Sequence, residues 1–343
     1  MKIICLEEHV FDNAIAQASR DVVMQEAAYM ADWGSRVEDK PGTEAVPRPR
    51  LLAAKHALPL ACETGKARIA DMDRHGIDMQ VLSHSNSPQQ IPDDSARDRV
   101  RAANDALAEV VRNTPSRFAG FASLPWQMPE VAASELERAV TELGLKGTLL
   151  NGRPGASFLD DERYTPILAR LNELRVPIYL HPGSPLPAVQ QPYYGGLGRE
   201  VSARLSLFGW GWHNEAGVQL LRMILSGVFD RYPNLQVISG HWGEMVPFFL
   251  QRLDDMIPLE ASGLSRSITQ TYRDHVSVTP SGMLHLPHFE FIRTILGADR
   301  ILYSIDYPYL TMDGARRFLE ALPISQAEKD MIAHGNAERL LGL

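Results

Sequence analysis

Short apolar runs alternate with amphipathic helical patterns along most of the chain, and this alternation constrains the fold more than any other feature. Strands that alternate with helices form a parallel sheet with covered faces, and eight such strands close a barrel. We therefore predict an α/β fold, a single (β/α)8 TIM barrel over residues 1–343, with an open doubly wound sheet as the alternative. The runs interpreted as strands are 3–9, 79–84, 118–124, 146–151, 177–181, 236–241, 275–279 and 301–306.

The segments between these runs carry helix signals, with two exceptions. The pattern over 96–113 stops at Thr114-Pro115, because proline cannot continue a helix, and the pattern over 129–143 stops at Gly144. Residues 164–174 and 215–229 show the same periodicity. The stretches 11–64 and 182–214 are too long for one loop and helix, so we predict loop insertions after strands 1 and 5. Such segments commonly form lids, binding loops or subunit contacts.

Composition excludes several classes of function. A chain of 343 residues with 45% hydrophobic content can bury a large core without disulfides. The net charge of -8 argues against a nucleic-acid partner, which needs a basic patch. Cys5 and Cys62 are the two cysteines, and no signal peptide or membrane-length apolar stretch is evident. We expect a cytoplasmic protein with free thiols that does not associate with membranes.

Four of the predicted strands end in residue types that bind metals. Glu7 and His9 close the first strand, His181 the fifth, His241 the sixth and Asp306 the eighth. The active site of a (β/α)8 barrel lies at the carboxyl ends of its strands, so these side chains are expected to converge on one mouth. Each residue alone is weak evidence, because a buried histidine or a helix-capping aspartate is common. Their joint occurrence behind apolar runs favours an active site with a metal.

Alternation along the first strand refines this prediction. Glu7 and His9 are two residues apart and share one face, whereas Glu8 points the other way and takes a structural role. Imidazoles combined with carboxylates suit Zn²⁺ or Mn²⁺ better than Mg²⁺ or Ca²⁺, which prefer oxygen ligands. Because thiolates are absent from the set, a closed structural zinc site is not expected.

Further polar residues lie near the predicted mouth. His84 ends the second strand, Asn151 ends the fourth, and Tyr309 follows Asp306, so we predict that these three contact a substrate. The histidines interpreted as surface or packing residues are His56, His75, His213 and His334.

The motifs at these strand ends resemble those of the aminocarboxymuconate-semialdehyde decarboxylase-like branch of the amidohydrolase superfamily. Within that branch they are most similar to the γ-resorcylate and 2,3-dihydroxybenzoate decarboxylases. The resemblance extends to residues 336–339 and is weakest over 11–64 and 187–212. The motifs are Leu6-Glu7-Glu8-His9, Tyr179-Leu180-His181-Pro182, Ser239-Gly240-His241-Trp242-Gly243-Glu244 and Ser304-Ile305-Asp306-Tyr307-Pro308-Tyr309.

This resemblance implies a (β/α)8 barrel that forms a homodimer or homotetramer and binds one divalent ion per chain, Zn or Mn. The positions that match the family's metal ligands are Glu7, His9, His181 and Asp306. His241 and Glu244 match the pair beside the metal, and Asn151, Arg252 and Tyr309 match positions near the substrate.

The resemblance also implies a reaction, the metal-dependent, non-oxidative decarboxylation of a small ortho-hydroxy aromatic carboxylic acid. Asp306 would protonate the ring carbon before CO2 leaves, assisted by His241 and Glu244, because direct loss of CO2 would leave a high-energy aryl anion. The alternatives are a hydrolase of a lactone or amide, a hydratase, and a non-catalytic ligand-binding barrel. The pattern Glu7-x-His9, with Asn151 in place of a bridging lysine, counts mildly against a binuclear hydrolase.

Overall fold

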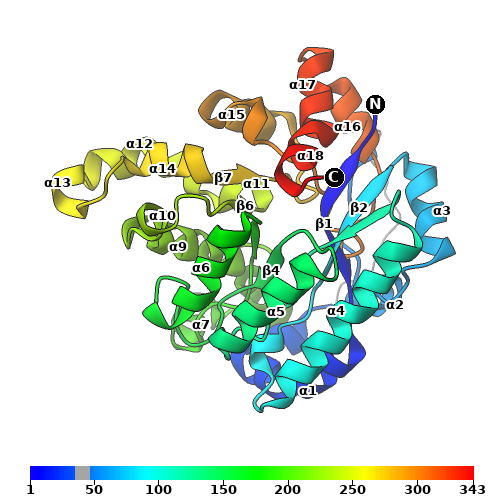
Figure 1. Cartoon of the computed structure of the whole chain (residues 1–343), viewed down its shortest axis with the longest axis horizontal. Helices are drawn as coiled ribbons and strands as arrows, with labels where there is room; N and C mark the ends of the chain where they lie inside the picture. Colours follow the sequence, from blue (N-terminus) through cyan, green and yellow to red (C-terminus); the bar gives the residue numbers. More distant parts are fainter. Residues whose placement is uncertain (35–46) are drawn as a thin grey trace.

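The computed structural model describes residues 1–34 and 47–343 of the chain (Figure 1). Residues 35–46, which include Pro41 of the first predicted insertion, lie outside the described residues.

Parallel strands form the centre of the fold. They make two sheets, in the orders β1-β2-β3 and β4-β5-β6-β7, and a bridge between Ala122 and Thr148 joins the two. This continuous parallel arrangement agrees with the predicted α/β class. The strands are β1 (Ile4–Val10), β2 (Met79–His84), β3 (Phe118–Gly120), β4 (Thr148–Asn151), β5 (Ile178–His181), β6 (Val237–Ser239) and β7 (Val276–Val278).

The predicted eighth strand is an extended segment rather than a regular strand. It closes the barrel through single bridges, from Ile301 to Val278 and from Ser304 to Leu6. The ladder is interrupted because the backbone N–H of Ile305 donates to the side chain of Glu8 at 2.9 Å instead of to a neighbouring strand. The segment nevertheless carries Asp306 to the mouth beside β1.

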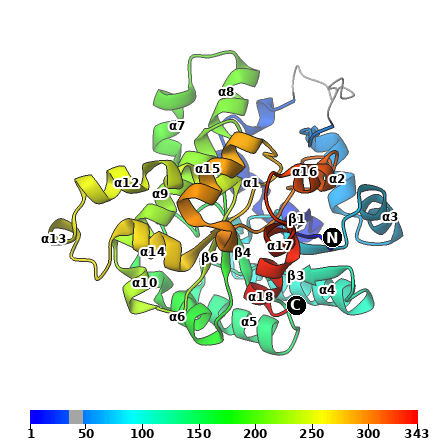
Figure 2. The same ribbon diagram turned by 90° about the horizontal axis from the view of Figure 1, so that it is seen from above.

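Helices surround the strands (Figure 2). The predicted helix over 215–229 is two helices, because Gly227 adopts a left-handed φ of 71° between them. The helices outside the two insertions are α3 (Lys66–His75), α4 (Ser95–Asn113), α5 (Pro129–Thr141), α6 (Thr165–Leu174), α9 (Gly211–Leu225), α10 (Val228–Arg231), α11 (His241–Glu244), α12 (Val246–Met256), α13 (Leu259–Ser262), α14 (Ile268–His275), α15 (Leu286–Leu296), α16 (Ala315–Ala321), α17 (Gln326–Asp330) and α18 (Asn336–Leu341). Among the described residues, no helix is long and apolar enough to cross a membrane.

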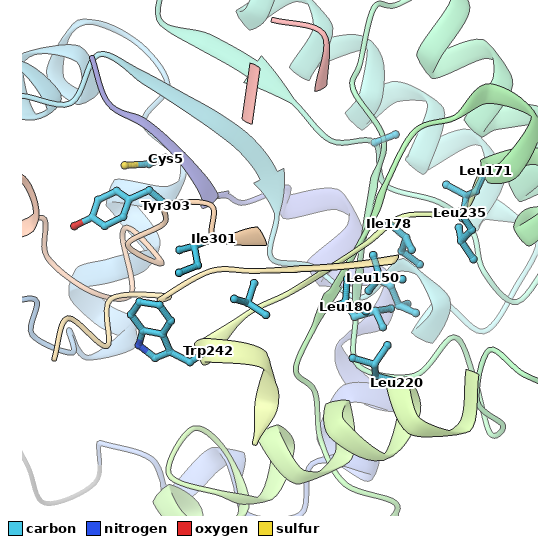
Figure 3. Close-up of a cluster of buried hydrophobic side chains, with 14 of the residues drawn as sticks. Cys5, Leu150, Leu171, Ile178, Leu180, Leu220, Leu235, Trp242, Ile301 and Tyr303 are labelled. Carbon is cyan, nitrogen blue, oxygen red and sulfur yellow. The ribbon is translucent and has the colours of Figure 1, made fainter. Parts of the chain in front are cut away.

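Two apolar clusters hold this arrangement together. One lies between strands and helices, where Leu150 and Leu180 of the sheet pack with Leu171 of α6 and Leu220 of α9 (Figure 3). The other comes mainly from the alternate strand positions, including Leu149, and fills the barrel interior. Each fully buried leucine contributes about 1.5–3 kcal/mol to the free energy of folding. This packing fixes the positions of the strands and therefore of their ends.

The two predicted loop insertions contain helices. The first includes α1 (Asn13–Glu26) and α2 (Ala54–Ala61), and the second includes α7 (Pro187–Tyr194) and α8 (Arg199–Ser206). They contact each other: the amide of Gln190 donates to the carbonyl of Glu26 at 2.6 Å, and Arg199 forms an ion pair with Asp32 at 2.6 Å. In Figure 1, α1 and α7 lie at the end of the barrel away from the two chain termini.

Candidate active site

A bulge in β1 directs Glu7 into the barrel mouth. Cys5 pairs with Gln80 and Glu8 pairs with Leu82, so two residues of β1, Leu6 and Glu7, oppose one residue of β2. Glu7 has a left-handed φ of 63°. Glu7 and His9 lie together in the mouth, fully buried. Glu8 points elsewhere and accepts hydrogen bonds from Ile305 and Gln80. The structure thus orients these three side chains as alternation predicts, although the strand is not regular there.

Four side chains from distant parts of the chain meet at this mouth. Glu7, His9, His181 and Asp306 each offer one ligand atom, and these atoms all lie within 4.8 Å of one another. His9 Nε2 is 3.1 Å from Asp306 Oδ1, and His181 Nε2 is 3.8 Å from Glu7 Oε1. The other ring nitrogen of His181, Nδ1, lies 2.8 Å from the carbonyl of Pro182, so Nδ1 carries the hydrogen and the Nε2 lone pair faces the cluster.

Unsatisfied polar atoms show that this cluster suits a cation. Among the described residues, Glu7 Oε1, His9 Nε2 and Asp306 Oδ1 are buried and accept or donate no hydrogen bond. Burying such atoms without a partner costs free energy, and one divalent ion between them would satisfy all three. Burial raises the pKa of Glu7, as does the nearby charge of Asp306, and burial holds the pKa of His181 well below its usual value. The neutral His181 imidazole is the form that binds a metal.

Hydroxyl groups fix the second oxygen of Glu7. Its Oε2 accepts hydrogen bonds from Ser281, from Ser304 at 3.1 Å and from Thr279 at 3.4 Å. The Ser281 hydroxyl also accepts the backbone N–H of His241 at 2.9 Å. Sequence reasoning missed these residues, although Thr279 and Ser304 belong to the ends of the seventh and eighth apolar runs. A polar side chain at the end of an apolar run is the sequence signal that could have identified them.

Beside this cluster, one carboxylate joins two histidines. Glu244 Oε1 lies 2.8 Å from His241 Nδ1, and Glu244 Oε2 lies 2.9 Å from His213 Nδ1. Burial is the largest single influence on the pKa of His241 and lowers it, but the charge and hydrogen bond of Glu244 act together with the charges of Glu7 and Asp306 and raise this pKa to about 9. Burial alone would raise the pKa of Glu244, yet the two histidines hold it below its ordinary value. The interpretation of His213 as a surface or packing residue was therefore wrong, because a contact across 31 residues brings it into the site.

The four predicted substrate-contact residues differ in position. The Tyr309 ring is 5.6 Å from that of His9, and its hydroxyl lies 2.7 Å from Ser85 Oγ. Asn151 donates to the carbonyl of His84 at 3.0 Å, which ties its amide to the backbone. Burial lowers the pKa of His84 to about 4, so this imidazole is neutral. Arg252 is exposed on α12, and its contact with substrate stays a prediction.

Backbone strain is concentrated at the mouth. Eight described residues other than glycine have a positive φ, and all but Arg175 belong to the strand ends and turns that carry the site. Such conformations cost about 1–3 kcal/mol each and persist where the surrounding structure enforces them, commonly at functional sites. The seven are Glu7, His241, Trp242, Glu244, Met245, Ser281 and Asp306.

Comparison with known proteins places this site in a family. The amidohydrolase family model matches residues 47–343 of the chain. This chain belongs to the amidohydrolase family. Among its relatives, the γ-resorcylate decarboxylase of a Polaromonas species is 35% identical over 99% of this chain and 98% of its own length. The family resemblance inferred from the strand-end motifs is confirmed.

Solved structures of amidohydrolase-family decarboxylases have the same fold. A dihydroxybenzoic acid decarboxylase from Polaromonas, with bound manganese and the inhibitor 2-nitroresorcinol, is 33% identical over 100% of this chain and 97% of that one, with a TM-score of 0.82. The 5-carboxyvanillate decarboxylase of Novosphingobium aromaticivorans, complexed with manganese and 4-hydroxy-3-methoxy-5-nitrobenzoic acid, is 31% identical over 100% and 96%, with a TM-score of 0.85. These matches confirm the predicted α/β barrel class.

Proposed function

We propose that this protein is a metal-dependent, non-oxidative decarboxylase of an ortho-hydroxy aromatic carboxylic acid of the dihydroxybenzoate type. By its kinship to the decarboxylases above, the chain is a carboxy-lyase of the amidohydrolase superfamily. The observation that carries the finer proposal is the set of buried, unpartnered ligand atoms of Glu7, His9 and Asp306 in a mouth that also holds His241, whose Nδ1 contacts Glu244.

The metal part of the proposal rests on the donor set. Glu7, His9, His181 and Asp306 would hold one Mn²⁺ or Zn²⁺ ion, because two imidazoles and two carboxylates suit these ions. The manganese of the two decarboxylase structures favours Mn²⁺. When bound, such an ion supplies positive charge that orients a substrate carboxylate and favours ionisation of a neighbouring hydroxyl group.

Asp306 is the best-placed acid for the chemical step. Its side chain is 16% exposed, so it faces both the buried cluster and the open mouth. In the proposed step, the Asp306 carboxyl donates its proton to the ring carbon that bears the substrate carboxylate, and a new C–H bond forms. The bond to the carboxylate then breaks, CO2 leaves, and the electron pair restores the aromatic ring. The Asp306 carboxylate regains a proton from solvent, which completes the cycle.

His241 supplies charge to the same step. With a pKa of about 9 it is protonated at neutral pH, and its Nδ1 is engaged by Glu244, so Nε2 is the nitrogen left to contact the substrate. An imidazolium there stabilises the negative charge of the acid and of its ionised hydroxyl. An aromatic wall continues from the metal cluster, since the Trp212 ring is 6.1 Å from His181 and 5.9 Å from Phe208. This wall suits a planar ring.

A substrate panel tests the proposal. The protein, loaded with Mn²⁺, is incubated with 2,6-dihydroxybenzoate, with 2,6-dimethoxybenzoate and 3,5-dihydroxybenzoate as analogues that lack an ortho hydroxyl, and with a lactone and an aryl amide. Release of CO2 and of hydrolysis products is measured. We expect CO2 release from the ortho-hydroxy acid alone, because the methoxy group cannot ionise and a meta hydroxyl cannot place charge on the carbon to be protonated. Hydrolysis faster than any decarboxylation, or equal turnover of the meta isomer, would contradict it. A chelator-treated and reloaded sample is the control.

The proposal includes the homodimer or homotetramer expected from the family resemblance. Phe248 and Phe249 of α12 are 71% and 50% exposed, and the ring of Phe248 lies 5.8 Å from that of Phe291 on α15. A second copy of the chain would cover such an aromatic patch, which is unusual on a monomer surface. Sedimentation velocity should show an oligomer that Phe248→Asp weakens, and a wild-type monomer at micromolar concentration would contradict this part.

A further inference from the structure

His213 contacts the active site but has no role in the proposed chemical step. It lies in the first turn of α9, directly after the second insertion, and its ring centroid is 4.3 Å from that of His241. The two imidazoles flank Glu244, each on its own carboxylate oxygen, and the Glu244 side chain is only 1% exposed. Glu244 is thus held from both sides in a buried environment.

Hydrogen positions in this trio follow from the acceptors. An ionised carboxylate has no hydrogen to donate, so the Nδ1 atoms of both His213 and His241 carry hydrogens that point at Glu244. The far nitrogen of His213, Nε2, lies 2.8 Å from the carbonyl of Phe208 and 3.2 Å from the indole Nε1 of Trp212. If Nε2 carries a hydrogen, it donates to the carbonyl of Phe208. If it does not, it accepts a hydrogen bond from the indole N–H of Trp212. His213 is therefore anchored whichever charge it carries.

We infer that His213 is a positioning residue for the proposed reaction, which holds the Glu244 carboxylate so that His241 presents Nε2 to the substrate. The inference rests on the proposed function and deepens it. With a single imidazole partner, the Glu244 carboxylate could rotate about its terminal bond, since that torsion has a broad energy minimum. The second imidazole removes this freedom. The Nδ1 atom of His241 lies 2.8 Å from Glu244 Oε1, so the direction of the His241 ring depends on where this carboxylate is held.

The test compares two substitutions of His213. His213→Leu removes both ring nitrogens, whereas His213→Asn places an amide N–H where Nδ1 was. We expect the leucine variant to lower kcat by about 10–100-fold, the range typical when a supporting hydrogen bond to a functional side chain is lost, with KM and manganese content little changed. The asparagine variant should recover most of kcat. His334 pairs with Glu338 at 2.8 Å far from the site, so His334→Leu is the matched control and should keep wild-type kcat.

A double-mutant cycle separates positioning from general destabilisation. In a Glu244→Gln background, His213→Leu should lower kcat by less than about threefold further, because no carboxylate remains to be held. Independent effects that multiply in the double variant would overturn the inference. So would a leucine variant with kcat within twofold of wild type, or an asparagine variant that folds but loses kcat more than tenfold. If His213→Leu does not fold, the kcat of His213→Asn decides: a loss of more than tenfold overturns the inference, and recovery of most of kcat supports it.

A crystal structure tests the role of His213 without any measurement of turnover, so its result is independent of the proposed function. In a crystal structure of His213→Leu, the Glu244 carboxylate and the His241 ring should be rotated or disordered, while Glu7 and His9 keep their positions. An unchanged Glu244–His241 pair would overturn the role of His213 even if decarboxylation is established. If no hydroxybenzoate is decarboxylated by the wild type, the proposed function fails, and this structural result still decides whether His213 positions the pair.

Discussion

The hydroxyl group of Ser281 joins the metal cluster to the His241–Glu244 pair, so Ser281→Ala perturbs both at once. Ser281 Oγ donates to Glu7 Oε2 and accepts the backbone N–H of His241 at 2.9 Å. Serine and alanine experience the same strain at the Ser281 φ of 45°, so the substitution reports on the hydroxyl group alone. We expect the variant to fold less stably and to bind a metal ion more weakly.

The magnitude follows from the two hydrogen bonds. Losing a bond to a buried carboxylate costs about 1.5–3 kcal/mol, and the low end applies because Ser304 and Thr279 still donate to Glu7. Leaving the His241 N–H without an acceptor adds about 1–3 kcal/mol. The free energy of unfolding of the metal-free protein should therefore fall by about 3 kcal/mol. Metal affinity should fall about 10–100-fold, since Glu7 loses part of its orientation.

Urea denaturation of the metal-free protein and manganese titration against a competing chelator measure the two effects. Ser19→Ala is the matched control, because Ser19 is buried but its hydroxyl donates only within α1, to the carbonyl of Ile15 at 2.9 Å. The control should lose less than about 1 kcal/mol. A loss of the same small size in Ser281→Ala, together with wild-type manganese affinity, would refute the role assigned to this hydroxyl.

Three further predictions concern the carboxylates and a buried histidine. Glu7→Gln should abolish manganese binding and turnover while Glu8→Gln keeps the metal, and metal analysis showing the reverse would mean that their roles are exchanged. Asp306→Asn should still bind substrate but lose at least about 100-fold in kcat, and appreciable turnover would move the acid role to His241. For His84, burial lowers the pKa from 6.5 to about 4, so only the unfolded chain takes up this proton as pH falls through that window. The free energy of unfolding, measured by urea denaturation, should fall by up to about 3 kcal/mol between pH 6.5 and pH 4. His84→Gln should remove this part of the pH dependence, and an unchanged pH dependence would contradict a neutral, buried His84.

The strand ends were predictable because their signals are local. An apolar run followed by Glu7-x-His9, His181 or Asp306 needs no knowledge of distant contacts, and parallel topology brings such ends to one mouth. The bulge at Glu7 did not alter this outcome, since it still leaves Glu7 and His9 in the mouth and Glu8 outside it.

Other features depended on contacts that residue patterns do not encode. The last strand is irregular because Glu8 takes the N–H of Ile305, a contact across 297 residues. His213 is drawn into the site by Glu244, which no local pattern around His213 indicates. The insertions, predicted as loops, contain helices such as α7 that are packed against α1 and the turn after it. The second insertion is rich in proline and glycine, which obscures its helical periodicity.

Isotope labelling during a single reaction tests the central proposal most directly. The manganese-loaded protein is incubated in D2O with an ortho-hydroxybenzoate carrying ¹³C in its carboxyl group, and the products are followed by NMR. Protonation of the ring by an exchangeable acid predicts that the label appears as ¹³CO2 and that one deuterium occupies the ring carbon that carried the carboxylate. Label retained in the organic product, or a ring without deuterium at that carbon, would contradict decarboxylation by ring protonation.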